Sequence, residues 1–329
     1  MANCSKLTAK KTMNILPEIL NASARIQNYV LKTPLLYSNY LSQLCDGQVY
    51  LKLESEQYTG SFKARGSMNK ILWLEEIENE NGVITASTGN HGMGVARALS
   101  ILKKDGKVIV PHNVVPAKYE ALKSFGAEVR KIGADGFEAE MNAIEISKKE
   151  NLTYISPYND PQIIGGQGTI AVEIAEQHPG KIDNLFVTVG GGGLISGIGT
   201  YFRLTRPETK IFGCQPENSP EMALSVRSNS YVTVEQKETL SDGSAGAFEE
   251  DSITFPICKN VIDEFFLVSE KEIADSINLV LTTERKLIEG AAGVAVASFI
   301  QNINRFKGQT SVIVICGGNI SKDKIRKIL

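Results

Sequence analysis

The segment with the clearest chemical character is a run of four glycines (Gly190, Gly191, Gly192, Gly193) between an apolar stretch and a helix-period segment that begins at Leu194. Because glycine has no Cβ atom, successive backbone N–H groups can converge on one anion, and the positive end of the following helix adds to the attraction. The run therefore predicts a phosphate-binding loop, with a flexible turn as the alternative. No Gly-Lys-Ser/Thr follows, which excludes a Walker-type nucleotide loop.

Lys63 lies in the segment SFKARG (residues 61–66), directly before an apolar-periodic helix through Met68, Ile71 and Leu72. An amine sheltered from water has a lowered pKa, and the neutral form is the nucleophile that makes a Schiff base. Taken alone, however, a lysine close to an arginine is more often a solvated surface charge.

Two further segments carry polar groups next to glycines. STGNHG (residues 87–92) follows an apolar run at 82–84 and precedes a helix at 95–101. Its Ser, Thr and Asn side chains either cap that helix or, together with the helix N-terminal amides, bind a carboxylate. CGGN (residues 316–319) follows a run of Val and Ile, and its thiol is either a buried core group or part of a site.

The elements that must position these segments alternate between strands and helices. Short β-branched runs end in glycine or polar turns and are followed by segments of helical period, which is the pattern of βαβ units with parallel sheets. Such sheets bind ligands at the carboxyl ends of their strands, where the glycine-rich segments fall. The expected strands are 108–110, 185–189, 210–215 and 311–316, and the expected helices after the first two are 117–125 and 194–202.

Composition excludes several classes of protein. The chain has 329 residues, 42% of them apolar and 22% charged, which is typical of folded globular proteins. Thirty-five basic and 37 acidic residues give a net charge of −2, so we expect no nucleic-acid partner. No apolar run reaches the roughly 18 residues that span a bilayer, and the N-terminus lacks a secretory pattern, so we expect a cytoplasmic protein without a membrane partner. The five scattered cysteines predict free thiols.

In this order, the segments resemble those of pyridoxal phosphate enzymes of fold type II, the tryptophan synthase β-like fold, and specifically the serine/threonine dehydratase and serine racemase group. The resemblance extends over nearly the whole chain, from TPL at 33–35 to CGGN at 316–319. The segments that carry it are SFKARG at 61–66, STGNHG at 87–92, GGQGT at 165–169, GGGGL at 190–194, SDG at 241–243 and EGAAG at 289–293.

The resemblance implies a role for each matching residue. Lys63 would form the Schiff base with pyridoxal 5'-phosphate, Phe62 would pack beside the ring, and Asn90 would bind its 3-hydroxyl oxygen. Cys316 would face the pyridine nitrogen. The phosphate would be held by Gly190, Gly191, Gly192, Gly193 and Leu194, and the substrate carboxylate by Ser87, Gly89, Asn90 and His91.

The implied activity is a dehydratase, or ammonia-lyase, that converts L-serine, L-threonine or a related β-hydroxy amino acid to a 2-oxo acid and ammonia. Lys63 would take the Cα proton. A thiol at Cys316 cannot form a carboxylate–pyridinium ion pair, which favours elimination over transamination. One alternative is a racemase with Lys63 and Thr88 on opposite faces. Others are a dehydratase of a less common β-hydroxy amino acid, such as a hydroxyectoine-degradation intermediate, and a non-catalytic carrier.

The resemblance also implies a two-domain α/β fold with parallel-rich twisted sheets flanked by helices and the cofactor in the interdomain cleft. Residues 1–81 and 152–329 would form a large domain and residues 82–151 a small mobile one, and the protein would be a homodimer. A divalent or monovalent cation is also known in this group. Its ligands here would be Gln215, Ser219 and Glu221, and the missing carboxylate at Gln215 makes a divalent cation doubtful.

Overall fold

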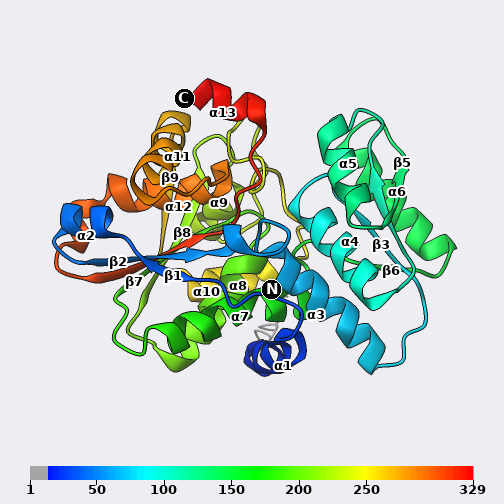
Figure 1. Ribbon diagram of the computed structural model, residues 1–329, viewed down its shortest axis with the longest axis horizontal. Coiled ribbons are helices and arrows are strands. Elements are labelled where there is room, and N and C mark those ends of the chain that lie inside the picture. The colour runs from blue at the N-terminus through cyan, green and yellow to red at the C-terminus, as the bar shows by residue number, and fades with distance from the viewer. Residues whose placement is uncertain (1–13, 329) are drawn as a thin grey trace, which may run out of the picture.

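Two β-sheets organise the chain, for which the computed structural model describes residues 14–328 (Figure 1). The larger sheet has six strands, and all its neighbouring strands are parallel except the antiparallel pair β1 and β2. In spatial order its strands are β1 (Leu35–Tyr37), β2 (Gln48–Leu53), β10 (Thr310–Ile315), β7 (Asn184–Thr188), β8 (Lys210–Pro216) and β9 (Glu264–Val268).

The smaller sheet is wholly parallel and is formed by one continuous part of the chain. Its spatial order is β5 (Glu128–Lys131), β4 (Gly106–Val110), β3 (Val83–Ala86) and β6 (Thr153–Tyr154). Three helices pack around it, namely α4 (Asn90–Leu102), α5 (Pro116–Ser124) and α6 (Gly136–Lys149). The parallel α/β arrangement expected from the sequence is therefore confirmed.

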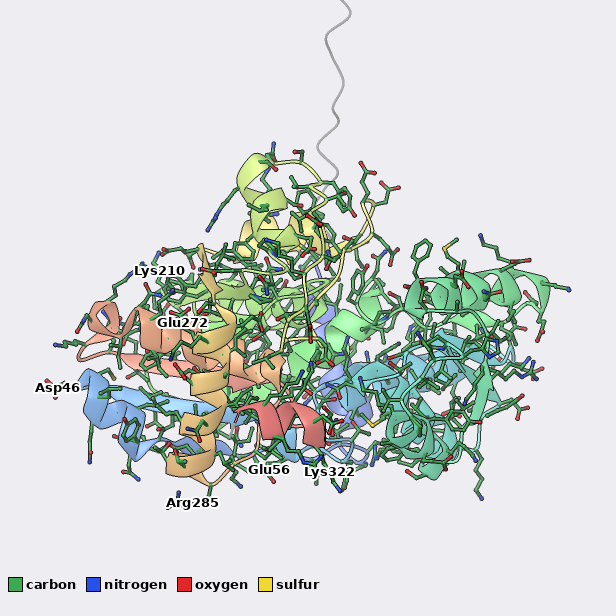
Figure 2. The ribbon with its side chains drawn as sticks, turned by 90° about the horizontal axis from the view of Figure 1, so that it is seen from above. Asp46, Glu56, Lys210, Glu272, Arg285 and Lys322 are labelled. Carbon is green, nitrogen blue, oxygen red and sulfur yellow. The ribbon has the colours of Figure 1, made fainter. Side chains whose placement is uncertain are left out.

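The remaining helices surround the larger sheet. Those on one side are α1 (Leu16–Ile26), α7 (Pro161–Gln177), α8 (Gly193–Thr205) and α10 (Thr254–Val261). On the other side lie α11 (Glu270–Glu284) and α12 (Gly290–Gln301), and Figure 2 shows α11 crossing that face between Glu272 and Arg285. The others are α2 (Asn39–Cys45), α3 (Lys63–Glu76), α9 (Glu221–Ser228), α13 (Lys322–Ile328) and the short 3₁₀ helices η1 (Glu54–Glu56) and η2 (Ile303–Phe306).

Coverage on both faces explains why the central strands are continuously apolar rather than alternating. Phe186 of β7 stacks on Phe212 of β8 with ring centroids 5.0 Å apart, and Phe212 stacks in the same way on Phe266 of β9 at 5.0 Å. Phe299 of α12 meets Phe186 edge-to-face at 5.4 Å. This aromatic ladder fixes α12 against the sheet and therefore places the residue before it, Glu289.

Glycines bring α3, α7 and α8 unusually close together. A Cβ on Gly166 of α7 would lie 2.6 Å from the Cα of Gly66 on α3, and a Cβ on Gly168 would lie 2.5 Å from Ile19 of α1. Gly197 of α8 faces α7 in the same way. The glycines of the segment GGQGT thus serve helix packing, and they place the helix that begins at Lys63 next to the helix that begins at Gly193.

The predicted elements all occur, with ends that differ by a few residues. No helix within residues 14–328 is long and apolar enough to cross a membrane. Cys45, Cys214, Cys258 and Cys316 are free and buried, as predicted, whereas Cys4 lies outside the described residues.

Candidate active site

The candidate site forms where the carboxyl ends of β7 and β10 meet the start of α3. These two strands are parallel neighbours, so Gly190 and Cys316, which follow them closely, reach the same edge of the sheet. The chain before α3 is tied to this edge. Ser61 and Gly317 form an isolated antiparallel bridge, and the Phe62 N–H donates to the Cys316 carbonyl at 3.0 Å. Lys63 therefore starts its helix beside Cys316.

The Lys63 amine lies in a water-poor position. Its Nζ donates to the carbonyl of Pro157 at 2.7 Å and lies 5.1 Å from the centroid of the Phe62 ring. Burial lowers the pKa of Lys63 to about 8, against the raising effect of Cys316 and Glu289. A substantial fraction of this amine is therefore neutral near physiological pH, which a surface lysine is not.

Arg65, two residues after Lys63, carries a buried charge. Its guanidinium is fully buried. It donates to Glu54 at 2.7 and 2.8 Å and to Glu173 at 2.6 and 2.9 Å, and Lys52 donates to Glu173 at 2.6 Å. The buried charges are thus paired, as they must be. This network joins α3 to β2, η1 and α7 two residues after Lys63.

The four-glycine run has the form of an anion cradle. Gly192 has φ +84°, a left-handed conformation that favours glycine, and the Tyr158 ring fills the space that a Cβ on Gly191 would need. The Gly191 carbonyl accepts a hydrogen bond from Thr254 at 2.7 Å. Within residues 14–328, the N–H groups of Gly190, Gly191 and Gly192 donate to no other protein group. They stand at the start of α8, whose dipole favours an anion.

The segment STGNHG leads into α4 in the small sheet. The N-cap is Gly89, and no side chain caps the helix, so the capping hypothesis for this segment is wrong. Ser87 Oγ accepts from the Gly89 N–H at 3.2 Å, and the Thr88 hydroxyl makes no hydrogen bond with the described part of the chain. His91 differs from the others. Its ring is buried with Nε2 3.0 Å from the Ile155 carbonyl, and burial lowers its pKa to about 3.

A carboxylate that the sequence did not single out lies behind Asn90. Asn90 Nδ2 donates to Glu289 Oε1 at 2.9 Å and to Oε2 at 3.0 Å, and Asn319 Nδ2 donates to Asn90 Oδ1 at 2.7 Å. Burial raises the pKa of Glu289 to about 7. The available sequence signal was the single acidic residue at the start of the otherwise apolar segment EGAAG.

The three candidate cation ligands lie together but satisfy one another. Gln215 Oε1 accepts from the Ala223 N–H at 2.7 Å, and its Nε2 donates to the Ser219 carbonyl at 3.4 Å. Ser219 Oγ donates to Glu221 at 2.8 Å, and Gln236 donates to the other Glu221 oxygen. Residues 14–328 hold no group of three or more His, Cys, Asp or Glu side chains suited to a metal ion. This donor set does not fit a divalent cation, which needs several free oxygens.

Comparison with known proteins agrees with this geometry. Residues 26–317 match the sequence family described as "Pyridoxal-phosphate dependent enzyme". The chain belongs to this family. It is similar to the L-threonine ammonia-lyase of Thermotoga maritima, with 40% identity over 96% of this chain and 78% of the relative.

Solved structures of family members have the same fold. Threonine deaminase isoform 2 of Solanum lycopersicum, in its processed form, superposes with a TM-score of 0.91 and 33% identity over 100% of this chain and 96% of the other. Serine racemase of Dictyostelium discoideum superposes with a TM-score of 0.85 and 32% identity over 94% and 99% of the two chains.

The residues present fit the family's cofactor, pyridoxal 5'-phosphate. The test is structural: the cradle has free N–H groups where the phosphate would be held, and a desolvated amine stands where the aldehyde would be bound. Lys63 would supply the covalent link, and residues 190–194 would hold the phosphate. Phe62 and Cys316 are both in this neighbourhood, since one packs by the amine and the other accepts the Phe62 N–H.

Proposed function

We propose that this chain is an ammonia-lyase that converts L-threonine, L-serine or a related β-hydroxy amino acid to a 2-oxo acid and ammonia. The observation that carries the proposal is the Lys63 amine, desolvated beside Cys316 and next to a free N–H cradle. The 40% identity to a threonine ammonia-lyase supports the substrate class. When bound, pyridoxal phosphate draws electrons from the bonds at Cα and so eases loss of the Cα proton.

In this proposal Lys63 Nζ is the general base that takes the Cα proton. With a pKa of about 8, part of the Lys63 amine is neutral near physiological pH and can accept a proton. A general base works best when its pKa lies near the working pH, and this condition is met here. The Pro157 carbonyl, 2.7 Å away, directs the amine. Once this proton is removed, the β-hydroxyl gains a proton and leaves as water. The released enamine tautomerises to an imine, and one water hydrolyses the imine to the 2-oxo acid and ammonia.

Cys316 favours elimination. Burial raises the pKa of its thiol well above the usual value, so the sulfur stays protonated and offers no negative charge to the pyridine nitrogen. A neutral thiol gives the ring little help in stabilising negative charge at Cα, so a reaction in which that charge leaves with a β-substituent is favoured.

The substrate carboxylate would be held by Ser87, Gly89 and Asn90 at the start of α4, where free N–H groups attract anions. His91 would contribute only its backbone, because its ring is directed to Ile155.

A second candidate activity is racemisation with Thr88 as the opposite-face acid. It is favoured by the Thr88 hydroxyl, which is not used to cap α4, and by similarity to the Dictyostelium serine racemase. Chiral analysis of serine after incubation separates the two activities. We expect Thr88→Ala to abolish formation of D-serine while it spares 2-oxo acid release.

The proposal includes the organisation expected from the sequence. Residues 82–151 would move as a small domain against the remainder, and closure would exclude water from the site. The two-sheet arrangement supports this division, although β6 extends the smaller sheet to Tyr154. We also propose that the protein is a cytoplasmic homodimer and has no nucleic-acid partner.

The test uses the purified chain loaded with pyridoxal phosphate. We expect cofactor absorbance in the visible range and release of 2-oxo acid from L-threonine or L-serine. Both should be lost in Lys63→Ala. Lys271→Ala, which removes an exposed lysine of α11 that pairs with Asp275, is the control and should preserve both signals. A chain that binds no cofactor, or a Lys63→Ala chain that keeps turnover, would overturn the proposal.

A further inference from the structure

Glu289 is a buried carboxylate that the reaction steps described above do not use. It occupies the N-cap position of α12, but its side chain does not cap that helix. Instead both oxygens accept hydrogen bonds from Asn90 Nδ2, and Oε2 also accepts the Asn319 N–H at 3.2 Å. A Cβ on Gly317 would come within 2.6 Å of Oε1. Three segments therefore enclose this carboxylate, namely the start of α4, the start of α12 and residues 317–319.

These contacts specify how the Asn90 amide is turned. Its nitrogen faces the carboxylate, and its oxygen accepts from Asn319 Nδ2, which is held in turn by the Thr59 carbonyl at 2.8 Å. Rotation of the amide by half a turn would place oxygen against the carboxylate and nitrogen against nitrogen. An ionised carboxylate only accepts hydrogen bonds, so it rejects the rotated form.

We propose that Glu289 is a positioning residue that sets the orientation of the Asn90 amide toward the cofactor, and that it does so only when ionised. This rests on the proposed function and on the contact with the cofactor's 3-hydroxyl oxygen that the family resemblance implies for Asn90. A protonated Glu289 carries an O–H donor and can pair with the Asn90 oxygen as well as with its nitrogen. Protonation therefore weakens the preference for the observed amide orientation, which then depends on the Asn319 contact alone.

The charged groups around Glu289 place this change near neutral pH. Burial raises the pKa of Glu289 to about 7 and is opposed by the Asn90 hydrogen bond. Asp242, in the segment between α9 and α10, raises this pKa further, whereas Lys118 of α5 lowers it. Lys63 of α3 and Cys316 after β10 also interact with the carboxylate. Glu289 is thus ionised above about pH 7 and neutral below it.

The experiment measures the dissociation constant of pyridoxal phosphate for the cofactor-free chain between pH 6 and pH 8.5. In the wild type we expect affinity to rise about tenfold as pH increases through about 7, the size expected for one hydrogen bond to a charged group. Glu289→Gln should bind weakly throughout and lack that step. Because Glu289 also raises the pKa of Lys63, both chains are titrated again in a Lys63→Ala background, where the Lys63 contribution is absent and the Glu289 step should remain.

Two further variants keep the result interpretable. Asp263→Asn replaces a carboxylate at the start of β9, where it accepts the Ile211 N–H at 2.8 Å, and it should retain the step. Asn319→Ala keeps Glu289 but removes the contact to the Asn90 oxygen, so it should weaken binding at every pH and retain the step. This variant tests the inference even if Glu289→Gln does not fold.

The outcomes separate the two proposals. A wild-type chain that binds no pyridoxal phosphate contradicts the proposed function. A chain that binds it with the same step near pH 7 in wild type and Glu289→Gln overturns only the inference about Glu289. Loss of the step near pH 7 in Asn319→Ala would also overturn it, because Glu289 is unchanged in that variant and still donates no hydrogen bond when ionised.

Discussion

Gly166 and Gly66 lie in contact between α7 and α3, so close that a Cβ on Gly166 would stand 2.6 Å from the Gly66 Cα. Because α3 begins at Lys63, this contact sets how deeply the reactive amine is placed. We predict that Gly166→Ala forces the helices apart, costs about 1–3 kcal/mol of unfolding free energy as overpacking does, and weakens cofactor binding.

Urea unfolding and cofactor titration check this prediction together. The matched control is Gly136→Ala at the first residue of α6, where a Cβ meets nothing within 4 Å and the substitution should be nearly neutral. Equal stability of the two variants would show that the close helix contact is not required.

The pH dependence of cofactor capture follows from Lys63. Its pKa of about 8 is below that of a free lysine, so the fraction of neutral amine grows as pH rises through 8. Since only the neutral amine attacks an aldehyde, we predict that the rate of covalent capture by the cofactor-free chain increases up to about pH 8 and then levels off. Stopped-flow absorbance measures this rate. A rate that keeps rising to pH 10 would mean that the amine is exposed to water.

The ion pairs of Arg65 predict a large loss of stability on truncation. Arg65→Ala would leave Glu54 and Glu173 buried without their main partner, which we expect to cost about 3–5 kcal/mol. Lys271→Ala, which removes an exposed ion pair with Asp275 at 2.5 Å, should cost less than about 0.5 kcal/mol. Chemical denaturation of both variants gives the comparison, and similar losses would contradict the buried network.

Because the Gln215 side chain is already hydrogen-bonded, we predict that divalent cations affect neither cofactor binding nor activity of the wild-type chain. Treatment of the wild-type chain with a chelator should change neither cofactor absorbance nor 2-oxo acid release. Gln215→Glu places a second carboxylate near Glu221, so the variant should be less stable alone and should regain melting temperature in millimolar calcium, because a cation that binds only the folded state stabilises it. A calcium-dependent shift in the wild type would refute this interpretation.

The local sequence determined the parallel α/β class and the phosphate-loop hypothesis. Strands such as 311–316 are runs of β-branched residues that only a sheet covered on both faces can bury, and four consecutive glycines are needed only where the backbone itself makes the contact. The same reasoning could not show that Arg65 is buried or that no side chain of STGNHG caps α4, because burial and cap geometry depend on what packs against a segment.

Tertiary structure alone decided how distant charges combine. Glu289 meets Asn90, 199 positions away in the chain, and Arg65 meets Glu173, 108 positions away, pairings that no local pattern encodes. Because water is excluded from these positions, the pKa of each buried group is set by the few groups that contact it. Residue types and spacing therefore determined which chemistry was available, whereas folding decided which groups face one another and which of them hold a proton.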